Sequence, residues 1–237
     1  MAMNSRIIFP LRRLAHLDRE SFQDYWLNQH ASLVKKHART LGIIRYQQVH
    51  TLQDTRPTKV DSFDGVAEIW ADPNVAEGTP SEQRDAGIAL FEDERTFIDL
   101  ARSPIWVAEE DVLLDGPREG VRITALLKRK PGTTRQQFRA HWHDIHGPWA
   151  LRHPEVWGFT HYVQNHAPLD AESNPLAAMR DAPEPFDGVS EIYRRASTAP
   201  QEVVDRMRAE ILEDEHNFLD VDHSPVFTGS VHVIIPG

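Results

Sequence analysis

The second half of this sequence repeats the first, and this duplication constrains the fold more than any other feature. The segment Phe22–His30 returns as Phe138–His146, and both copies have the pattern Phe-x-x-Tyr/His-Trp-x-x-x-His. Farther along, Phe63–Trp70 returns as Phe186–Tyr193 in the same order. A repeat of this length is a duplicated domain and is too large for a solenoid unit. The sequence therefore predicts two domains of one fold.

Composition limits the partners and the location. The 237 residues carry a formal net charge of −10, which disfavours nucleic acid and anionic membranes as partners because both attract basic surfaces. No apolar run approaches the ~20 residues of a membrane span, and the N-terminal segment lacks the pattern of a signal peptide. The absence of cysteine excludes disulfides, thiolate nucleophiles and iron–sulfur clusters. A cytoplasmic location is the simplest expectation.

Each copy contains the same series of predicted elements. Short, partly β-branched segments at residues 6–11 and 122–129 predict first strands. Asp18 and Thr134 are the predicted N-caps of a helix whose apolar positions recur at helical spacing. Gly147-Pro148 predicts the end of that helix in the second copy, because proline disfavours helical geometry in the residue before it. The later elements are strands after Gly42 and Gly158, strands at the Phe-Asp-Gly-Val segments, helices beginning near Thr79 and Thr198, and strands at 106–114 and 227–235.

The predicted order β-α-β-β-α-β is the ferredoxin-like arrangement of an α+β protein. Helices cover one face of such a sheet and leave the other face bare and apolar. A second identical sheet covers that face, so we expect the two copies to form one intrachain barrel with pseudo-two-fold symmetry. The turn sequence Asp115–Pro117 places the domains at residues 1–115 and 116–237. The proline-containing loop 167–185 is expected to be a lid or a surface excursion.

These motifs resemble those of the EthD family. The resemblance rests on Phe-x-x-Tyr/His-Trp-x-x-x-His, Gly-x-x-x-Tyr-x-x-x-His and Phe-Asp-Gly-Val-x-Glu, each present once per copy. It implies the dimeric α/β barrel superfamily, whose small subunits normally pair and are here fused. It also implies catabolism of small organic molecules, or the dehydration or decarboxylation of polyketide intermediates. More distant relatives in that superfamily include cofactor-free monooxygenases and haem peroxidases.

His30 and His146 are the first candidates for catalysis. They share a helix face with Trp26 and Trp142, so their side chains should point at the sheet. A nearby helix C-terminus favours the imidazolium and burial favours the neutral ring, a balance that suits proton transfer near neutral pH. The alternative is that each histidine only hydrogen-bonds a carbonyl beneath the helix end.

A tyrosine and a histidine lie four residues apart on the second strand of each copy, and hence on one face. The pairs are Tyr46 with His50 and Tyr162 with His166. A phenol and an imidazole at these positions can hold and protonate a substrate oxygen. The alternative is that the tyrosine packs in the core and the histidine lies at a solvated strand end.

Four carboxylates of the third strands are expected on the side that faces the helices: Asp64, Glu68, Asp187 and Glu191. A carboxylate buried there needs a partner, because an unpaired buried charge is very costly. Glu191 or Asp187 could orient His146 as the acid of a dyad, whereas Glu68 and Asp64 would contribute to substrate binding. The alternative is a salt bridge to an arginine such as Arg45.

Tryptophans are candidates for the apolar walls of a binding pocket, with core packing as the alternative. The candidates are Trp26, Trp142 and Trp149. No metal is predicted at His141–His146, because side chains two residues apart on a helix diverge. No cofactor is predicted either, although haem ligation by His146 stays open through the haem-binding relatives. The acidic segments around Glu94 and Glu215 are simplest as solvated helix faces, with a specific partner for one of these two residues as the alternative.

Together these residues predict a cofactor-independent enzyme with a small hydrophobic, oxygenated substrate, aromatic or polyketide-like. The expected reaction is an acid–base step of a dehydratase, isomerase, cyclase or carbon–carbon lyase. If only one pocket works, we expect the one around His146, because the second copy has additional histidines. The alternatives are a cofactor-free monooxygenase and a non-catalytic carrier or accessory protein to an oxygenase. Exposed sheet edges are a candidate surface for a homodimer of the fused chain.

Overall fold

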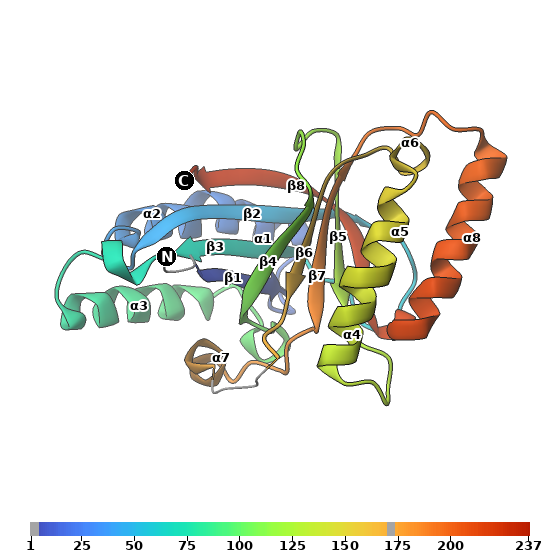
Figure 1. Cartoon of the computed structure of the whole chain (residues 1–237). Coiled ribbons are helices and arrows are strands. Elements are labelled where there is room, and N and C mark those ends of the chain that lie inside the picture. The colour runs from blue at the N-terminus through green and yellow to red at the C-terminus, as the bar shows by residue number, and fades with distance from the viewer. Residues whose placement is uncertain (1–4, 170–173) are drawn as a thin grey trace.

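The computed structural model describes residues 5–169 and 174–237 and is a closed antiparallel barrel with helices on its outside (Figure 1). Around the barrel the strand order is β1-β3-β2-β8-β5-β7-β6-β4. The strands are β1 (Ser5–Leu11), β2 (Ile43–Asp54), β3 (Gly65–Ala71), β4 (Trp106–Leu114), β5 (Val121–Leu127), β6 (Phe159–His166), β7 (Gly188–Arg194) and β8 (Val226–Ile235). The predicted α+β barrel is therefore confirmed.

The two halves contribute equal arcs of this barrel. The first half supplies β4-β1-β3-β2 and the second supplies β8-β5-β7-β6. The arcs join where β2 pairs with β8 and where β4 pairs with β6. This pairing occupies the sheet edges that the sequence analysis considered available for a homodimer, because a closed barrel has no free edge.

The helices lie outside the strands, with α1 to α3 on the side of the first half and α4, α5 and α8 on the side of the second (Figure 1). Asp18 and Thr134 are N-caps as predicted, and each accepts a backbone N–H in the first helical turn. In the described part of the chain, every helix is too short or too polar to span a bilayer. The helices are α1 (Arg19–Tyr25), η1 (Trp26–His30), α2 (Ala31–His37), η2 (Pro73–Val75), α3 (Pro80–Glu94), η3 (Leu100–Arg102), α4 (Arg135–His141), η4 (Trp142–His146), α5 (Gly147–Leu151), α6 (Pro154–Trp157), α7 (Pro175–Arg180), α8 (Gln201–Phe218) and η5 (Val221–His223).

The first long helix of each half contains one π-helical turn, η1 or η4. At this turn a strand glutamine reaches into the helix: Gln48 Nε2 donates to the carbonyl of Trp26 at 2.8 Å, and Gln164 Nε2 donates to that of Trp142 at 3.0 Å. The same carbonyl accepts the backbone N–H five residues later. A side-chain donor at a helix carbonyl widens the turn, and π turns are frequent at functional sites.

The prediction that Gly147-Pro148 ends the helix of the second half is wrong. The chain continues directly from η4 into α5, which extends to Leu151. Pro148 lies in the first turn after the π turn, a position where its fixed φ and missing N–H are tolerated. His30 and His146 thus lie inside continuous helical segments, so the dipole effect expected at a helix end does not apply to them.

The glycine of each Phe-Asp-Gly-Val segment makes room for a tryptophan. A Cβ added to Gly65 would lie 2.5 Å from the ring of Trp26, and one added to Gly188 would lie 2.4 Å from the ring of Trp142. Real Cβ contacts are not that short, so only glycine allows the indole to pack flat on the strand. This contact fixes the helix over the sheet in both halves.

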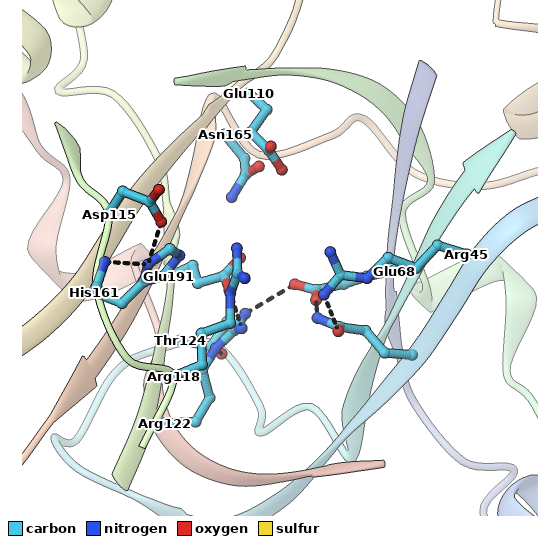
Figure 2. A network of polar contacts seen from close by, with 12 residues as sticks. Arg45, Glu68, Glu110, Asp115, Arg118, Arg122, Thr124, His161, Asn165 and Glu191 are labelled. Atoms are coloured by element: carbon cyan, nitrogen blue, oxygen red, sulfur yellow. Dashed lines mark hydrogen bonds and ion pairs between the residues drawn. The ribbon is translucent and has the colours of Figure 1, made fainter. Parts of the chain in front are cut away.

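The barrel interior holds a ring of four buried charges that spans both halves (Figure 2). Arg6 Nη2 lies 3.0 Å from Glu68 and 2.6 Å from Glu191, and Arg122 lies 2.8 Å from each of the same two carboxylates. Burial raises the pKa of Glu191, but Arg122 and Arg6 outweigh it and hold that pKa well below its ordinary value. The expectation that the sheet face without helices is apolar does not hold at these four residues, although Val49, Leu126 and other apolar residues fill much of the rest.

The loop between β6 and β7 returns to the first half of the chain. Residues 170–173 of the predicted loop 167–185 lie outside the described residues, and the part that follows forms α7. Leu176, Ala177 and Ala182 pack against the core that contains Phe9 and Trp26. The described part of this loop therefore covers the opposite half.

Candidate functional site

The space between the sheet and the helices contains one hydrogen-bonded group of three side chains in each half. In the first half, Tyr46 Oη accepts Trp26 Nε1–H at 2.9 Å and Gln48 Nε2–H at 2.9 Å. In the second half, Tyr162 Oη accepts Trp142 Nε1–H at 3.2 Å and Gln164 Nε2–H at 3.0 Å. The sequence analysis named the tyrosines and the tryptophans but missed the role of the glutamines. Their alternation with the tyrosines on one strand face was the available signal.

Two donors on each phenol oxygen leave the phenol hydrogen as the group that can be offered to a ligand. Burial raises the pKa of Tyr162 to about 12, although the hydrogen bonds from Gln164 and Trp142 and the nearby hydroxyl of Ser190 oppose this rise. Burial also raises the pKa of Tyr46. Both tyrosines are therefore protonated donors at neutral pH. Ser190 is peculiar to the second half, since Ala67 occupies the matching position in the first.

Each of the two helix histidines forms a dyad with an aspartate of the other long helix in the same half, α3 in the first half and α8 in the second. His30 Nδ1 lies 2.7 Å from Asp93 Oδ2, and His146 Nδ1 lies 2.7 Å from Asp214 Oδ2. The hydrogen bond from the histidine is the main cause of a lowered pKa in both aspartates. An ionised aspartate accepts the proton on Nδ1 and leaves Nε2 free as a base.

These aspartates were missed as partners. They are the middle residues of the repeated Glu-Asp-Glu segments, for which the sequence analysis considered only the glutamates. The second oxygen of each aspartate is also occupied, by Tyr25 Oη at 2.7 Å on Asp93 and by His141 Nε2 at 2.8 Å on Asp214. Each carboxylate is thus fixed at both oxygens, which holds the catalytic candidate ring in one orientation.

The four carboxylates that the sequence analysis assigned to His146 or to substrate binding contact arginines, which is the alternative considered there. Glu68 and Glu191 belong to the charged ring on the interior face of the barrel, opposite the face that the helices cover. Asp64 accepts the backbone N–H of Arg13 at 2.9 Å and pairs with its guanidinium, and Asp187 does the same with Arg129 at 2.8 Å. The prediction that Asp187 or Glu191 orients His146 is therefore wrong. Glu191 points into the barrel interior, and Asp187 forms an ion pair with Arg129.

His50 and His166 are buried beside the tryptophans rather than on a cavity wall. The ring of His50 stacks on Trp26 with centroids 4.7 Å apart, and that of His166 meets Trp142 edge-on at 4.8 Å. Burial lowers the pKa of each to about 3, so both rings are neutral at pH 7. His50 bonds Gln48 at 2.8 Å, whereas neither ring nitrogen of His166 has a partner among the described residues. The predicted contact of these histidines with a substrate oxygen does not fit this placement.

The two halves differ sharply in the space around their dyads. In the second half a cavity of about 540 Å³ is lined by Trp142, His146 and Tyr162 together with apolar residues of α8 and the sheet. In the first half the equivalent Trp26, His30 and Tyr46 line a cavity of about 40 Å³. A ligand pocket usually measures about 300 to 1,000 Å³. Only the second cavity is large enough for an organic substrate.

The difference arises from the loops that each half places over the other. Over the first half, Arg180 of α7 donates to Glu94 at 2.7 and 2.9 Å, and the helix fills the space beneath it. Over the second half, the matching ion pair is made by Arg56 and Glu215 at 2.7 Å, but the loop that carries Arg56 has no helix. Glu94 and Glu215 thus have the specific partners that the sequence analysis allowed, and both partners come from the opposite half.

The remaining predicted residues divide between the cavity and the core. Trp157 lines the cavity with Phe159 and Phe218. Trp149 packs on Trp157 with ring centroids 6.2 Å apart and is not among the described cavity-lining residues. Among the described residues, no three histidine, aspartate or glutamate side chains converge in a way that could hold a metal ion.

Comparison with known proteins gives one family and two structures. The EthD domain matches residues 14–101 and residues 130–222, one match in each copy of the repeat. No curated protein sequence matches the chain. A proposed monooxygenase of Lactobacillus acidophilus NCFM is 9% identical, with 98% of this chain and 96% of that one covered and a TM-score of 0.47. A proposed chlorite dismutase is 11% identical, with 97% and 95% covered and a TM-score of 0.49.

Proposed function

Because this chain belongs to the EthD family, we propose that it is an enzyme that moves a proton on a small, hydrophobic, oxygenated molecule bound in the cavity of its second half. The observation that carries the proposal is that His146, held by Asp214, and the Tyr162 phenol line one largely apolar cavity of about 540 Å³. A base and a hydrogen-bond donor that converge on an apolar space are the parts that acid–base catalysis requires.

The roles follow from the hydrogen bonds. Asp214 holds His146 through Nδ1, so Nε2 carries the lone pair that removes a proton from a carbon next to a substrate carbonyl. The electron pair of the broken C–H bond moves onto the carbonyl oxygen, where the O–H of Tyr162 stabilises the enolate by a hydrogen bond. Return of the proton to another carbon gives isomerisation, and its transfer to a departing hydroxyl gives water and a dehydrated product.

The test is proton exchange on a simple ketone. Purified protein and 2-tetralone are incubated in D₂O, and loss of the α-proton signals is followed by NMR. We expect His146→Ala to slow the exchange by roughly 10² to 10⁴-fold, the usual contribution of a general base. His30→Ala should leave the rate unchanged, because its cavity is filled. His143→Ala is the matched control, since this neighbouring side chain is 41% exposed and pairs with Asp111 away from the cavity.

Two other functions have distinct results in the same samples. Oxygen uptake that depends on substrate and on His146 would instead support a cofactor-free monooxygenase, in which His146 would remove the first proton. A haem iron is the competing occupant, since an axial histidine commonly donates its other N–H to a carboxylate. A Soret band in the purified protein that disappears in His146→Ala would overturn the cofactor-free chemistry. If the parent protein binds the ketone tightly but its α-protons exchange only at the background rate, the protein is a non-catalytic carrier.

We further infer that residues 1–115 and 116–237 are two ferredoxin-like units. The matching strand orders β4-β1-β3-β2 and β8-β5-β7-β6 support this division, as does one EthD match in each half. The two units depend on each other at the site, because Arg56 of the first unit lines the cavity of the second. The two units therefore act as one enzyme with one working cavity.

A further inference from the structure

The cavity of the second half has a positively charged wall in an acidic protein. Its charged lining residues, apart from His146, are Arg56, Arg194, Arg208 and Glu215, whereas the whole chain carries a net charge of −10. Arg56 is neutralised by Glu215 at 2.7 Å. Arg194 and Arg208 have no carboxylate partner among the described residues, so the lining keeps two uncompensated guanidinium groups.

Both arginines are next to the aromatic part of the cavity lining, since Arg208 follows Met207, which clusters with Trp157 and Phe159. Arg208 precedes Glu215 by two turns of α8, which places them roughly 10 Å apart along the helix axis at 1.5 Å per residue. Arg194 ends β7 and pairs across the sheet with Phe159, another lining residue. The cavity thus has an end with Arg194, Arg208 and aromatic side chains, and an end closed by the Arg56–Glu215 ion pair.

The repeat supports a specific role for this end. At the positions that match Arg194 and Arg208, the first half has Ala71 and Gly87. The dyad, the tyrosine and the tryptophan occur in both halves, so the arginines are not needed for the fold that the halves share. They accompany the open cavity and are missing from the filled one.

We propose that the substrate is an aromatic carboxylic acid whose carboxylate binds between Arg194 and Arg208. A guanidinium matches a carboxylate in bidentate geometry and is the preferred partner for one at a partly exposed site. Trp157 and Phe159 provide apolar faces for the ring. The inference rests on the proposed function only in placing the substrate in this cavity, with its reacting carbon toward His146.

The test compares two probes of one shape, 2-naphthoate and its uncharged amide, by titration calorimetry at pH 7.5. We expect the parent protein to bind the acid about tenfold more tightly than the amide, and Arg194→Gln/Arg208→Gln to bind the two equally. Arg195→Gln and Arg206→Gln are matched controls, because these neighbouring arginines are not among the described cavity-lining residues and pair with Glu119 and Glu210. Both controls should keep the preference for the acid.

Equal affinity of the parent for both probes, or an equal loss of preference in the controls, would overturn the inference. Failure of the parent to bind either probe at millimolar concentration would do the same, since the cavity would then reject a bicyclic aromatic ring. These results are separable from the proposed function, because exchange on the uncharged 2-tetralone depends on His146 and does not require the arginines. If the protein catalyses proton exchange on 2-tetralone but binds 2-naphthoate no more tightly than its amide, the substrate is neutral and the carboxylate proposal is wrong.

Discussion

The two halves of the barrel carry the same chemical groups around very different cavities. Each half has a tryptophan and a glutamine on a tyrosine oxygen, and a histidine on an aspartate with a distance of 2.7 Å. Yet the cavity measures about 40 Å³ in the first half and about 540 Å³ in the second. The repeated residues therefore specify the geometry of a site, but they do not decide whether a ligand can enter it.

Whether the cavity is open depends on the loop that each half places over the other half. The loop over the first half contains α7 and brings Leu176 and Ala177 into the core. The loop over the second half contributes the Arg56–Glu215 ion pair but no helix, and the space stays open. The halves thus share one set of site residues and differ in the loop above it, which carries the six-residue helix α7 over the first half and no helix over the second.

The largest effect on stability should come from the charged ring, to which each half contributes one arginine and one glutamate. Glu68→Gln and Glu191→Gln each leave Arg6 and Arg122 with one buried carboxylate fewer. Removing one partner of a buried ion pair costs about 3–5 kcal/mol, because the remaining charge is left uncompensated in a low dielectric. We expect both variants to lose this amount of unfolding free energy in urea.

Glu119→Gln is the control for this prediction, because its pair with Arg195 is more than half exposed on both sides and should contribute less than about 1 kcal/mol. Losses of similar size in the two ring variants would show that both halves depend on the ring. A loss confined to one of them, or smaller than that of Glu119→Gln, would contradict the shared role of the ring.

The sequence predicted most elements of the fold because each depends on local patterns that occur twice. Helical spacing from Phe22 to His37, the caps Asp18 and Thr134, and the turn at Gly158 are all properties of a few neighbouring residues. The end of the helix at Pro148 was mispredicted, since the π turn before it depends on Gln164 of a distant strand. Local sequence does not contain that contact.

The site was less predictable because both faces of the barrel strands are buried. Alternation separates Glu68 from Ala67, but it does not say which of them faces the helices when neither face is solvated. The small residues Gly65 and Ala67 were the overlooked indication, since the packed tryptophan needs small neighbours. The partners Asp93 and Asp214 depend on how two helices lie against each other, which follows from tertiary packing alone.

A smaller effect should distinguish the two loop contacts. Arg180→Ala leaves Glu94 buried without its two hydrogen bonds, with both side chains less than 10% exposed. We expect a loss of about 3 kcal/mol in unfolding free energy. Arg56→Ala removes a pair whose side chains are about 20% exposed, so a loss near 1 kcal/mol is expected. Thermal or urea unfolding monitored by tryptophan fluorescence measures both.

Arg180→Ala should also change how many ligand molecules the chain binds. If α7 is what excludes ligand from the first half, loosening it should raise the number of naphthoate or naphthamide molecules bound per chain above that of the parent protein. Arg56→Ala should not raise it, because the cavity beneath Arg56 is already open. An unchanged stoichiometry in Arg180→Ala, together with the expected loss of stability, would show that residues other than α7 fill the first cavity.

The last expected effect is a pH dependence of stability to which both halves contribute. Burial lowers the pKa of His50 and of His166 from 6.5 to about 3, so the unfolded chain takes up each proton first as the pH falls. The free energy of unfolding therefore decreases from about pH 6.5 toward pH 3, by about 2 kcal/mol per histidine at pH 5.

His166→Leu should remove its share of this pH dependence at little cost in stability, because neither ring nitrogen has a partner among the described residues. His50→Leu should remove the same slope but lower stability by about 1–3 kcal/mol at pH 8, since Gln48 loses its 2.8 Å bond. Urea unfolding at pH 5 and pH 8 measures both terms, and an unchanged slope in both variants would assign the acid sensitivity to other groups.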